Sequence, residues 1–243
     1  MDRIPDTNRA LRQRIEMDDF FTGFSIAAEH ESETTHREEN NLSGKCAENL
    51  EDIAVQIRKC SKCGLSSERN NAVPGEGADS ADIVFVGEAP GADEDRQGRP
   101  FVGRAGKLLD KILTACGLRR EDIFICNILK CRPPGNRDPK PDEVISCHPY
   151  LDSQLKIIRP KEIIALGAHA ARTLLDSKEA IGRLRGRFHD YYLDEQLPPV
   201  KLMPTYHPAY LLRNYSVDNR RKVWEDMQKV MKEVGLAVPG KGS

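Results

Sequence analysis

The sequence lacks the apolar segments that would place a protein in or across a membrane. Among its 243 residues, no apolar run approaches the ~20 residues that are needed to span a bilayer. The first residues, Met1–Asp19, hold no apolar stretch after their charges, which argues against a secretory signal. We therefore expect a cytoplasmic protein with no membrane partner.

The sequence also has little net charge, only −1 at neutral pH, which argues against a strongly basic nucleic-acid-binding protein. The charge is unevenly distributed, because residues 1–45 carry 10 acidic and 6 basic side chains, a net charge of −4, whereas the remainder carries +3. Residues 28–45 are polar and nearly free of large apolar side chains, which is typical of a disordered linker. We predict an acidic, largely disordered arm over residues 1–45. A mildly basic domain over residues 46–243 would be able to contact a phosphate backbone.

Internal repeats are absent too, and the folded region instead alternates short apolar runs with amphipathic helical patterns. The apolar runs predict strands at residues 83–87, 122–129, 162–166 and 200–206. The helical patterns predict a helix that runs into residue 60 and helices at residues 104–118, 141–158, 168–175 and 218–234. This alternation predicts an α/β fold of three layers, αβα, with a central four-stranded parallel sheet. Its ligand site should lie at the carboxyl ends of the strands.

Disulfide bonds are not expected, because the cysteines number seven and a cytoplasm keeps thiols reduced. Cys60 and Cys63 form a C-x2-C pair at the end of the first predicted helix, and Cys131 and Cys147 lie 16 positions apart. The four thiolates could hold one metal centre, although Cys131 and Cys147 could instead be ordinary buried thiols. The spacing alone does not distinguish zinc from an iron–sulfur cluster.

The loops after the predicted strands contain side chains that suit the binding of a nucleobase. The loop Gly87–Asp95 brings backbone close to a ligand and carries carboxylates, although a solvated acidic turn has the same composition. Phe101 lies in a glycine-flanked loop as either a stacking platform or a core residue. Asn127 interrupts an apolar strand, where its amide could read a base edge or bond to backbone. His207 follows the last strand, and it could donate to a developing anion or be structural.

Taken in order, these segments resemble the family 4 uracil-DNA glycosylases, the iron–sulfur branch of the uracil-DNA glycosylase superfamily. The resemblance covers about Ala47 to Val234 and rests on C-x2-C, GEAPGADED, GRPFVGRAG, CNILKCRPP and PTYHPAYLLRN. It implies base-excision repair of DNA, in which the N-glycosidic bond of a flipped uracil is hydrolysed, free uracil is released and an abasic site is left. It also implies a 4Fe-4S cluster, whose ligand positions match Cys60, Cys63, Cys131 and Cys147.

The resemblance assigns roles to individual side chains. Phe101 would stack on the extruded uracil, Asn127 would read its O4 and N3 atoms, and His207 would stabilise charge at O2. The other residues that it places in the catalytic and binding site are Glu88, Ala89, Pro90, Glu94 and Asn136, with Glu94 acting together with Asn136. Ala89 stands where many members have glycine, and we expect only a slight tightening of the pocket. The attacking water could be held by Glu88 or by Asp95, and the sequence leaves both open.

The segment after His207 could contact DNA. Leu211 or Leu212 would fill the gap that the extruded base leaves in the stack. Arg213 would meet phosphates, together with the basic residues Lys130, Arg132 and Lys140. We expect a monomer whose partner is uracil-containing DNA, single- or double-stranded.

Two other functions remain open from the sequence. A related branch of the superfamily traps uracil-DNA covalently through a histidine in an extra basic loop, which the short stretch between Cys131 and Cys147 lacks. The chain could also be a non-catalytic, metal-stabilised adaptor that recruits a replication or repair protein through its acidic arm. Turnover is the prediction that we carry forward.

Overall fold

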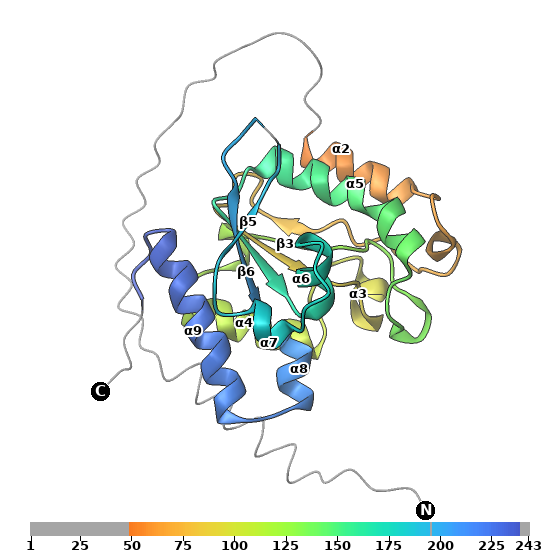
Figure 1. The fold of residues 1–243 in the computed structure, drawn as a ribbon. Coiled ribbons are helices and arrows are strands. Elements are labelled where there is room, and N and C mark those ends of the chain that lie inside the picture. The colour runs from red at the N-terminus through yellow and green to blue at the C-terminus, as the bar shows by residue number, and fades with distance from the viewer. Residues whose placement is uncertain (1–48, 195, 239–243) are drawn as a thin grey trace, which may run out of the picture.

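A computed structural model describes residues 49–194 and 196–238, so the predicted arm over residues 1–45 lies outside the described residues. Within that range the chain forms three layers, with helices on both faces of one twisted sheet (Figure 1). Across this part of the chain, none of the helices combines the length and the apolar character that crossing a bilayer requires.

The sheet has six strands in the order β1-β3-β2-β4-β6-β5. Their bounds are Glu76–Gly77 (β1), Ile83–Gly87 (β2), Phe124–Asn127 (β3), Glu162–Leu166 (β4), His189–Tyr191 (β5) and Val200–Thr205 (β6). The central strands β3, β2, β4 and β6 are mutually parallel, which confirms the predicted four-stranded parallel sheet. The two outer strands, β1 and β5, pair antiparallel to it and were not predicted, because segments this short carry no readable periodicity.

The helices follow the strands in alternation. They are Leu50–Lys59 (α2), Ala92–Gln97 (α3), Arg104–Ala115 (α4), Pro141–Ile158 (α5), Ala168–Leu174 (α6), Ile181–Leu184 (α7), Pro208–Arg213 (α8) and Val217–Glu233 (α9). Short 3-10 turns span Gly64–Ser67 (η1), Arg120–Asp122 (η2) and Pro134–Asn136 (η3). Two helices, α3 and α8, occupy segments that the sequence analysis treated as loops.

Alternation along the buried strands explains the layers, because successive side chains of a strand point to opposite faces. Ile83 and Phe85 of β2 pack in the cluster that contains the apolar sides of α4 and α9. Val84 and Val86 pack on the opposite face, in the cluster that contains α5 and α6. A third, smaller cluster joins α2 to α5 at one end of the sheet, where the two helices lie side by side (Figure 1).

The strand order sets the position of the binding cavity. From β2 the chain moves outward to β3, whereas from the neighbouring strand β4 it moves in the opposite direction to β6. The loops after β2 and β4 therefore diverge and leave a crevice at their carboxyl ends, which is where open α/β sheets bind ligands.

Candidate active site

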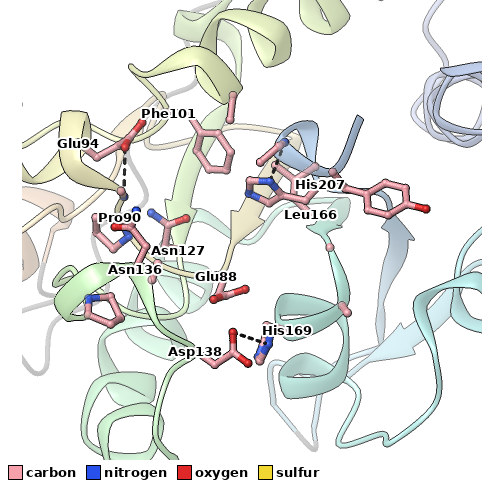
Figure 2. A pocket seen from close by; sticks show the side chains of 18 of the residues that line it. Glu88, Pro90, Glu94, Phe101, Asn127, Asn136, Asp138, Leu166, His169 and His207 are labelled. Atoms are coloured by element: carbon pink, nitrogen blue, oxygen red, sulfur yellow. Dashed lines mark hydrogen bonds and ion pairs between the residues drawn. The ribbon is translucent and has the colours of Figure 1, made fainter. Parts of the chain in front are cut away.

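A cavity of about 470 Å³ opens at the carboxyl ends of the parallel strands. Its walls come from the segments that follow β2, β3, β4 and β6, and the labelled side chains surround a common space (Figure 2). The residues singled out in the sequence that line it are Glu88, Ala89, Pro90, Glu94, Phe101, Asn127, Asn136, His207 and Arg213. The fold thus brings together an aromatic ring and a carboxylate from the segment after β2, an amide from the end of β3 and an imidazole from the loop after β6.

Phe101 forms a fixed wall of this cavity. Its backbone is left-handed, with φ of 51°, a conformation that a residue with a side chain adopts only when its surroundings enforce it. The Arg120 guanidinium donates to the carbonyl oxygens of Pro100, at 3.0 Å, and of Phe101. Gly106 of α4 packs so closely that a Cβ there would lie 1.7 Å from the Phe101 oxygen. The loop is therefore held by both a side chain and a helix.

Asn127 ends β3 with its side chain only 2% exposed. Its Oδ1 atom finds no hydrogen-bond partner among the described residues. The backbone oxygen of Asn127 accepts from Lys130 Nζ at 2.9 Å, and the same ammonium donates to Gln154 Oε1 at 2.6 Å. Leaving a buried acceptor unpaired is costly, and a donor on a bound ligand could offset that cost.

His207 presents a donor to the cavity. Its Nδ1 atom accepts from the backbone N–H of Ala209 at 3.0 Å, so in the neutral ring the proton resides on Nε2. Burial, reinforced by the charge of Arg213, lowers the pKa of His207 to about 4. The ring is therefore neutral at physiological pH. It lies 5.5 Å from the Phe101 ring, centroid to centroid.

Glu94 joins the loop after β2 to the loop that carries Phe101. Its Oε1 atom accepts from the backbone N–H groups of Val102 and Gly103, each at 2.9 Å, and its Oε2 atom accepts from Gly91 at 3.1 Å. Asn136, the residue expected to work with it, also lines the cavity. Its Oδ1 atom accepts from Arg132 Nε at 2.7 Å. The hydrogen bonds of Glu94 thus hold backbone in place.

Of the two carboxylates that the sequence left open for holding water, Asp95 faces away from the cavity. It is 2% exposed, and its oxygens accept from the backbone N–H of Asn70 at 2.9 Å and from Asn70 Nδ2 at 2.5 Å. The N–H of Asn71 donates to it as well, at 3.3 Å. Asp95 therefore anchors the loop after η1, and Glu88 is the carboxylate that lines the cavity.

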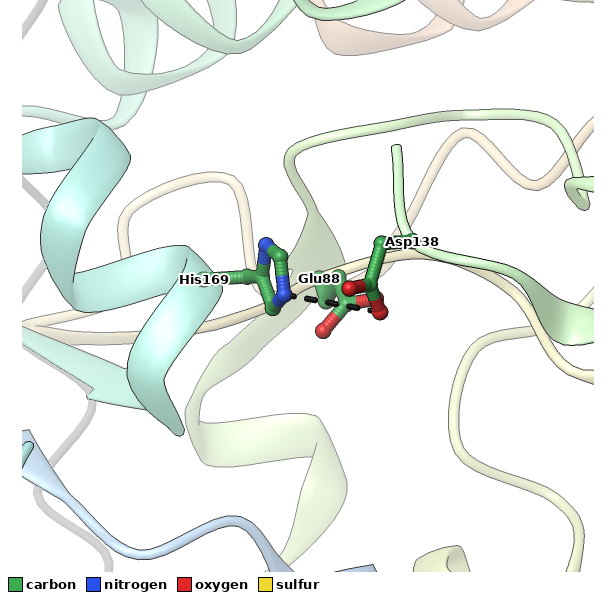
Figure 3. Close-up of side chains that lie close together, drawn as sticks. All are labelled: Glu88, Asp138 and His169. Carbon is green, nitrogen blue, oxygen red and sulfur yellow. Dashed lines mark ion pairs between the residues drawn. The ribbon is translucent and has the colours of Figure 1, made fainter. Parts of the chain in front are cut away.

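Two residues beside Glu88 were not found by sequence reasoning. The carboxylates of Glu88 and Asp138 and the imidazole of His169 have their polar atoms within 4.8 Å of one another (Figure 3). His169 Nε2 lies 3.6 Å from Asp138 Oδ1. Burial raises the pKa of Glu88, with Asp138 adding to the rise and His169 and Arg213 opposing it. Both missed residues follow predicted strands, which was the available signal.

Two expectations about DNA contact need correction. Lys130 is 1% exposed and bonds within the core, so it cannot meet a phosphate. Leu211 is also 1% exposed and packs in the cluster beneath α8, so it belongs to the core. Leu212 is partly exposed and Arg213 is exposed, and only Arg213 of these lines the cavity.

The four cysteines that were assigned to a metal centre line a second, small cavity between α2, η1 and α5. All four are free thiols. Three of the sulfurs accept hydrogen bonds, Cys131 from Arg69 Nη1 at 2.9 Å, Cys147 from the N–H of Lys130 at 3.2 Å, and Cys60 from the N–H of Lys62 at 3.5 Å. Such bonds stabilise thiolates that carry charge from a metal group.

The spacing of these sulfurs bears on what they could hold. In the described part of the chain, no three of them have their sulfurs within 4.8 Å of one another. Four thiolates on a single zinc ion would lie about 3.8 Å apart, given Zn–S bonds of about 2.3 Å. No three of the four sulfurs therefore have the spacing of ligands on one zinc ion, and the cavity that they line measures about 10 Å³.

The sequence matches the family model of the uracil DNA glycosylase superfamily over residues 74–228. A type-4 uracil-DNA glycosylase of Saccharolobus solfataricus is 48% identical over 188 residues, which cover 75% of this chain and 85% of that protein. One from Thermotoga maritima is also 48% identical, over 74% of this chain and 92% of its own length. A type-5 uracil-DNA glycosylase of Mycobacterium tuberculosis is 32% identical over 56% of this chain and 57% of that protein.

Proposed function

The chain belongs to the uracil DNA glycosylase superfamily, among its type-4 members, and on this premise we propose that it excises uracil from DNA. The reaction is hydrolysis of the N-glycosidic bond, which releases uracil and leaves an abasic site for DNA repair. The observation that carries the proposal is the convergence of Phe101, Asn127 and His207 on one cavity.

Base recognition would use the wall and the amide of the cavity. A uracil inside a duplex cannot reach this crevice, so the nucleotide must first be extruded from the stack. The extruded base would stack on Phe101. The unpaired Oδ1 of Asn127 would accept from uracil N3–H, while its Nδ2 would donate to O4. Cytosine presents the opposite pattern at these two atoms, so a fixed amide discriminates against it.

His207 would act on the departing base. Cleavage leaves negative charge on the uracil, and a donor aimed at O2 lowers the barrier because this charge is greatest in the transition state. The bond from Ala209 leaves Nε2–H as that donor. The low pKa of His207, about 4, keeps the ring neutral. The ring would therefore stabilise the uracil anion by donating a hydrogen bond while keeping its proton.

Glu88 would act on the sugar side. As the bond breaks, the sugar becomes positively charged, and a carboxylate beside it lowers the barrier and can hold the attacking water. Glu88 is favoured for this role because the oxygens of Asp95 already accept hydrogen bonds from Asn70 and Asn71. At the cavity mouth, Arg213 would contact a phosphate and the adjacent Leu212 would support the DNA stack.

We further propose that Cys60, Cys63, Cys131 and Cys147 hold a 4Fe-4S cluster. The cluster would supply a covalent cross-link between the end of α2, the loop after β3 and helix α5, and no chemical step is assigned to it. Support comes from the shared cavity, the free thiols and the hydrogen bonds that three of the sulfurs accept. We place the protein in the cytoplasm as a monomer.

The test uses the full chain and a single-stranded oligonucleotide with one uracil. Incubation followed by alkali should cut the strand at the uracil, and the matched thymine oligonucleotide should stay intact. The same oligonucleotide annealed to its complement is tested alongside, and a uracil strand that stays uncut in both forms would overturn the proposal in favour of an adaptor. A protein–DNA band that survives denaturing electrophoresis would instead identify covalent trapping, since a turnover enzyme leaves none.

A further inference from the structure

The three side chains beside the cavity mouth form a unit that the proposed chemistry does not yet use. We propose that His169 and Asp138 are positioning residues that keep the Glu88 carboxylate charged and correctly aimed, with His169 as its cation and Asp138 as the anion that orients His169. The inference rests on the proposed function, because it concerns the carboxylate assigned to the sugar side.

The geometry brings three separate segments to one point. Glu88 directly follows β2, Asp138 lies between η3 and α5, and His169 is in the first turn of α6. Their polar atoms lie within 4.8 Å of one another, and Figure 3 shows the imidazole of His169 facing both carboxylates. The backbone of Glu88 is fixed from the other side, because its carbonyl accepts from Leu129 N at 3.0 Å. The side chain of Glu88 lies against the pair.

The electrostatic need for such a pair follows from burial. A partly buried carboxyl loses hydration and tends to keep its proton, and a neutral Glu88 could not stabilise a cationic sugar. His169 and Arg213 are the cations that act against this tendency, and Asp138 is the anion that adds to it. Asp138 is 82% exposed, so its own charge is well hydrated, and it can orient the imidazole at a modest cost to Glu88.

Other charged groups of the same cavity are engaged elsewhere. Glu94 accepts from the backbone of residues 91, 102 and 103, and Arg137 forms an ion pair with Glu143 at 2.5 Å. His207 is neutral at physiological pH. His169 is therefore the remaining imidazole beside Glu88, with its Nε2 atom 3.6 Å from Asp138 Oδ1.

The experiment measures single-turnover uracil excision as a function of pH for the full-length protein and its variants. Activity requires ionised Glu88, so the rate falls as pH drops through the pKa of that carboxyl. His169→Gln removes a cation and should move this acidic limb to higher pH by about half a unit. Asp138→Asn removes an anion and should move the limb the other way, to lower pH. A residue that only supports the fold would not produce shifts of opposite sign.

Two further variants complete the design. His169→Lys keeps a positive charge and should restore the limb to the position of the unmodified protein. Asp190→Asn removes one negative charge at an ion pair with Lys201 on the edge strand β5, and should leave the profile unchanged. Unfolding midpoints of all variants should lie close to that of the unmodified protein, because none of the three substituted side chains is buried, with 40% of His169, 82% of Asp138 and 49% of Asp190 exposed.

The outcomes separate the two proposals. If the unmodified protein releases no uracil, the proposed function fails. If it releases uracil but His169→Gln and Asp138→Asn shift the limb in the same direction or not at all, the positioning role fails. A profile that changes when EDTA is added would also overturn it, because the three side chains would then be holding a divalent cation.

Discussion

At the scale of single residues, the unpaired side-chain oxygen of Asn127 is unfavourable for stability and suited to ligand binding. Oδ1 is buried without a hydrogen-bond partner among the described residues. Its lost hydration is not replaced by a protein hydrogen bond, which destabilises the folded state. A side chain that weakens the fold but faces the cavity is best explained by what it gains when a ligand arrives. The neighbouring Lys130 donates to the backbone carbonyl of Asn127 and so holds the main chain from which this side chain projects.

Asn127→Ala should reduce uracil excision by on the order of 100-fold, because the paired contacts to one base edge are lost. The same change should leave the thermal midpoint equal or slightly higher, because it removes an unsatisfied polar group. Excision kinetics and thermal unfolding on the same preparation check both statements. Near-normal turnover would contradict the base-reading role, and loss of the fold would contradict the account of stability.

At the scale of elements, the loop before α4 depends on contacts at its base. Phe101 keeps a left-handed backbone because Arg120 bonds its carbonyl and because Gly106 lets α4 approach closely. Arg120 also pairs with Glu76 at 2.7 Å and with Asp110 at 2.6 Å. One guanidinium thus joins the loop to β1 and to α4, and it controls the position of a ring that it does not touch.

Arg120→Met should raise the KM for uracil-containing DNA about tenfold and change kcat less, since the stacking wall loses its support. Arg119→Met is the matched control, because its ion pairs with Glu121 and Asp122 lie on the surface, where solvent screens them. Steady-state kinetics on both variants make the comparison. An equal effect of the two substitutions would show that Arg120 has no special link to Phe101.

The central elements were predictable, and the reasons are physical. Strands β2 and β4 and helix α5 match their predicted bounds because continuous apolar runs and a proline at a helix start are strong local signals. Edge strands of two and three residues gave no such signal. Asp138 and His169 were missed because their proximity to Glu88 arises from the crossing of loops after different strands, which sequence spacing does not encode.

At the scale of the whole molecule, the cysteine cavity brings together three segments that are far apart in the sequence. Cys60 ends α2, Cys131 follows β3 and Cys147 lies in α5. A group bound by all of them would restrict the unfolded chain and tie the loop after Asn127 to two helices. The proposed cluster would therefore stabilise the fold directly, and it would affect uracil excision only through that stability.

Cys131→Ala should lower iron content and the thermal midpoint together, because one ligand of four is lost. Cys116→Ala is the matched control, since Cys116 is buried at the end of α4 outside this cavity and burial raises its pKa to about 12. Chemical iron analysis and visible absorbance of anaerobically purified protein provide the readout. Full iron content in Cys131→Ala would exclude that residue as a ligand.

A buried carboxyl at the amino ends of the parallel strands, away from the candidate active site, should make the stability of the fold depend on pH. Glu162 begins β4, is 1% exposed and has no partner for either oxygen among the described residues. Burial raises its pKa from 4.5 to about 8, with Glu233 adding to the rise and Lys201 opposing it. The unfolded chain releases this proton at lower pH than the folded chain, so stability should fall as pH rises from 4.5 to about 8.

Glu162→Gln removes that titration and should unfold at a higher temperature than the unmodified protein at pH 8, with the difference shrinking toward pH 4.5. Thermal unfolding across this pH range measures the difference in unfolding temperature between the two proteins. Glu225→Gln, at a 52% exposed position of α9, should behave like the unmodified protein throughout. A gap that does not change with pH would contradict the assignment.

Lys130 links the cysteine cavity to the end of β3, where Asn127 lies. Its backbone N–H donates to Cys147 Sγ at 3.2 Å, and its ammonium donates to the carbonyl of Asn127 at 2.9 Å. Oxidative damage that strips iron from the proposed cluster would therefore reach the uracil-reading amide through one amino acid. Loss of the proposed cluster should therefore weaken base recognition before it exposes the hydrophobic core.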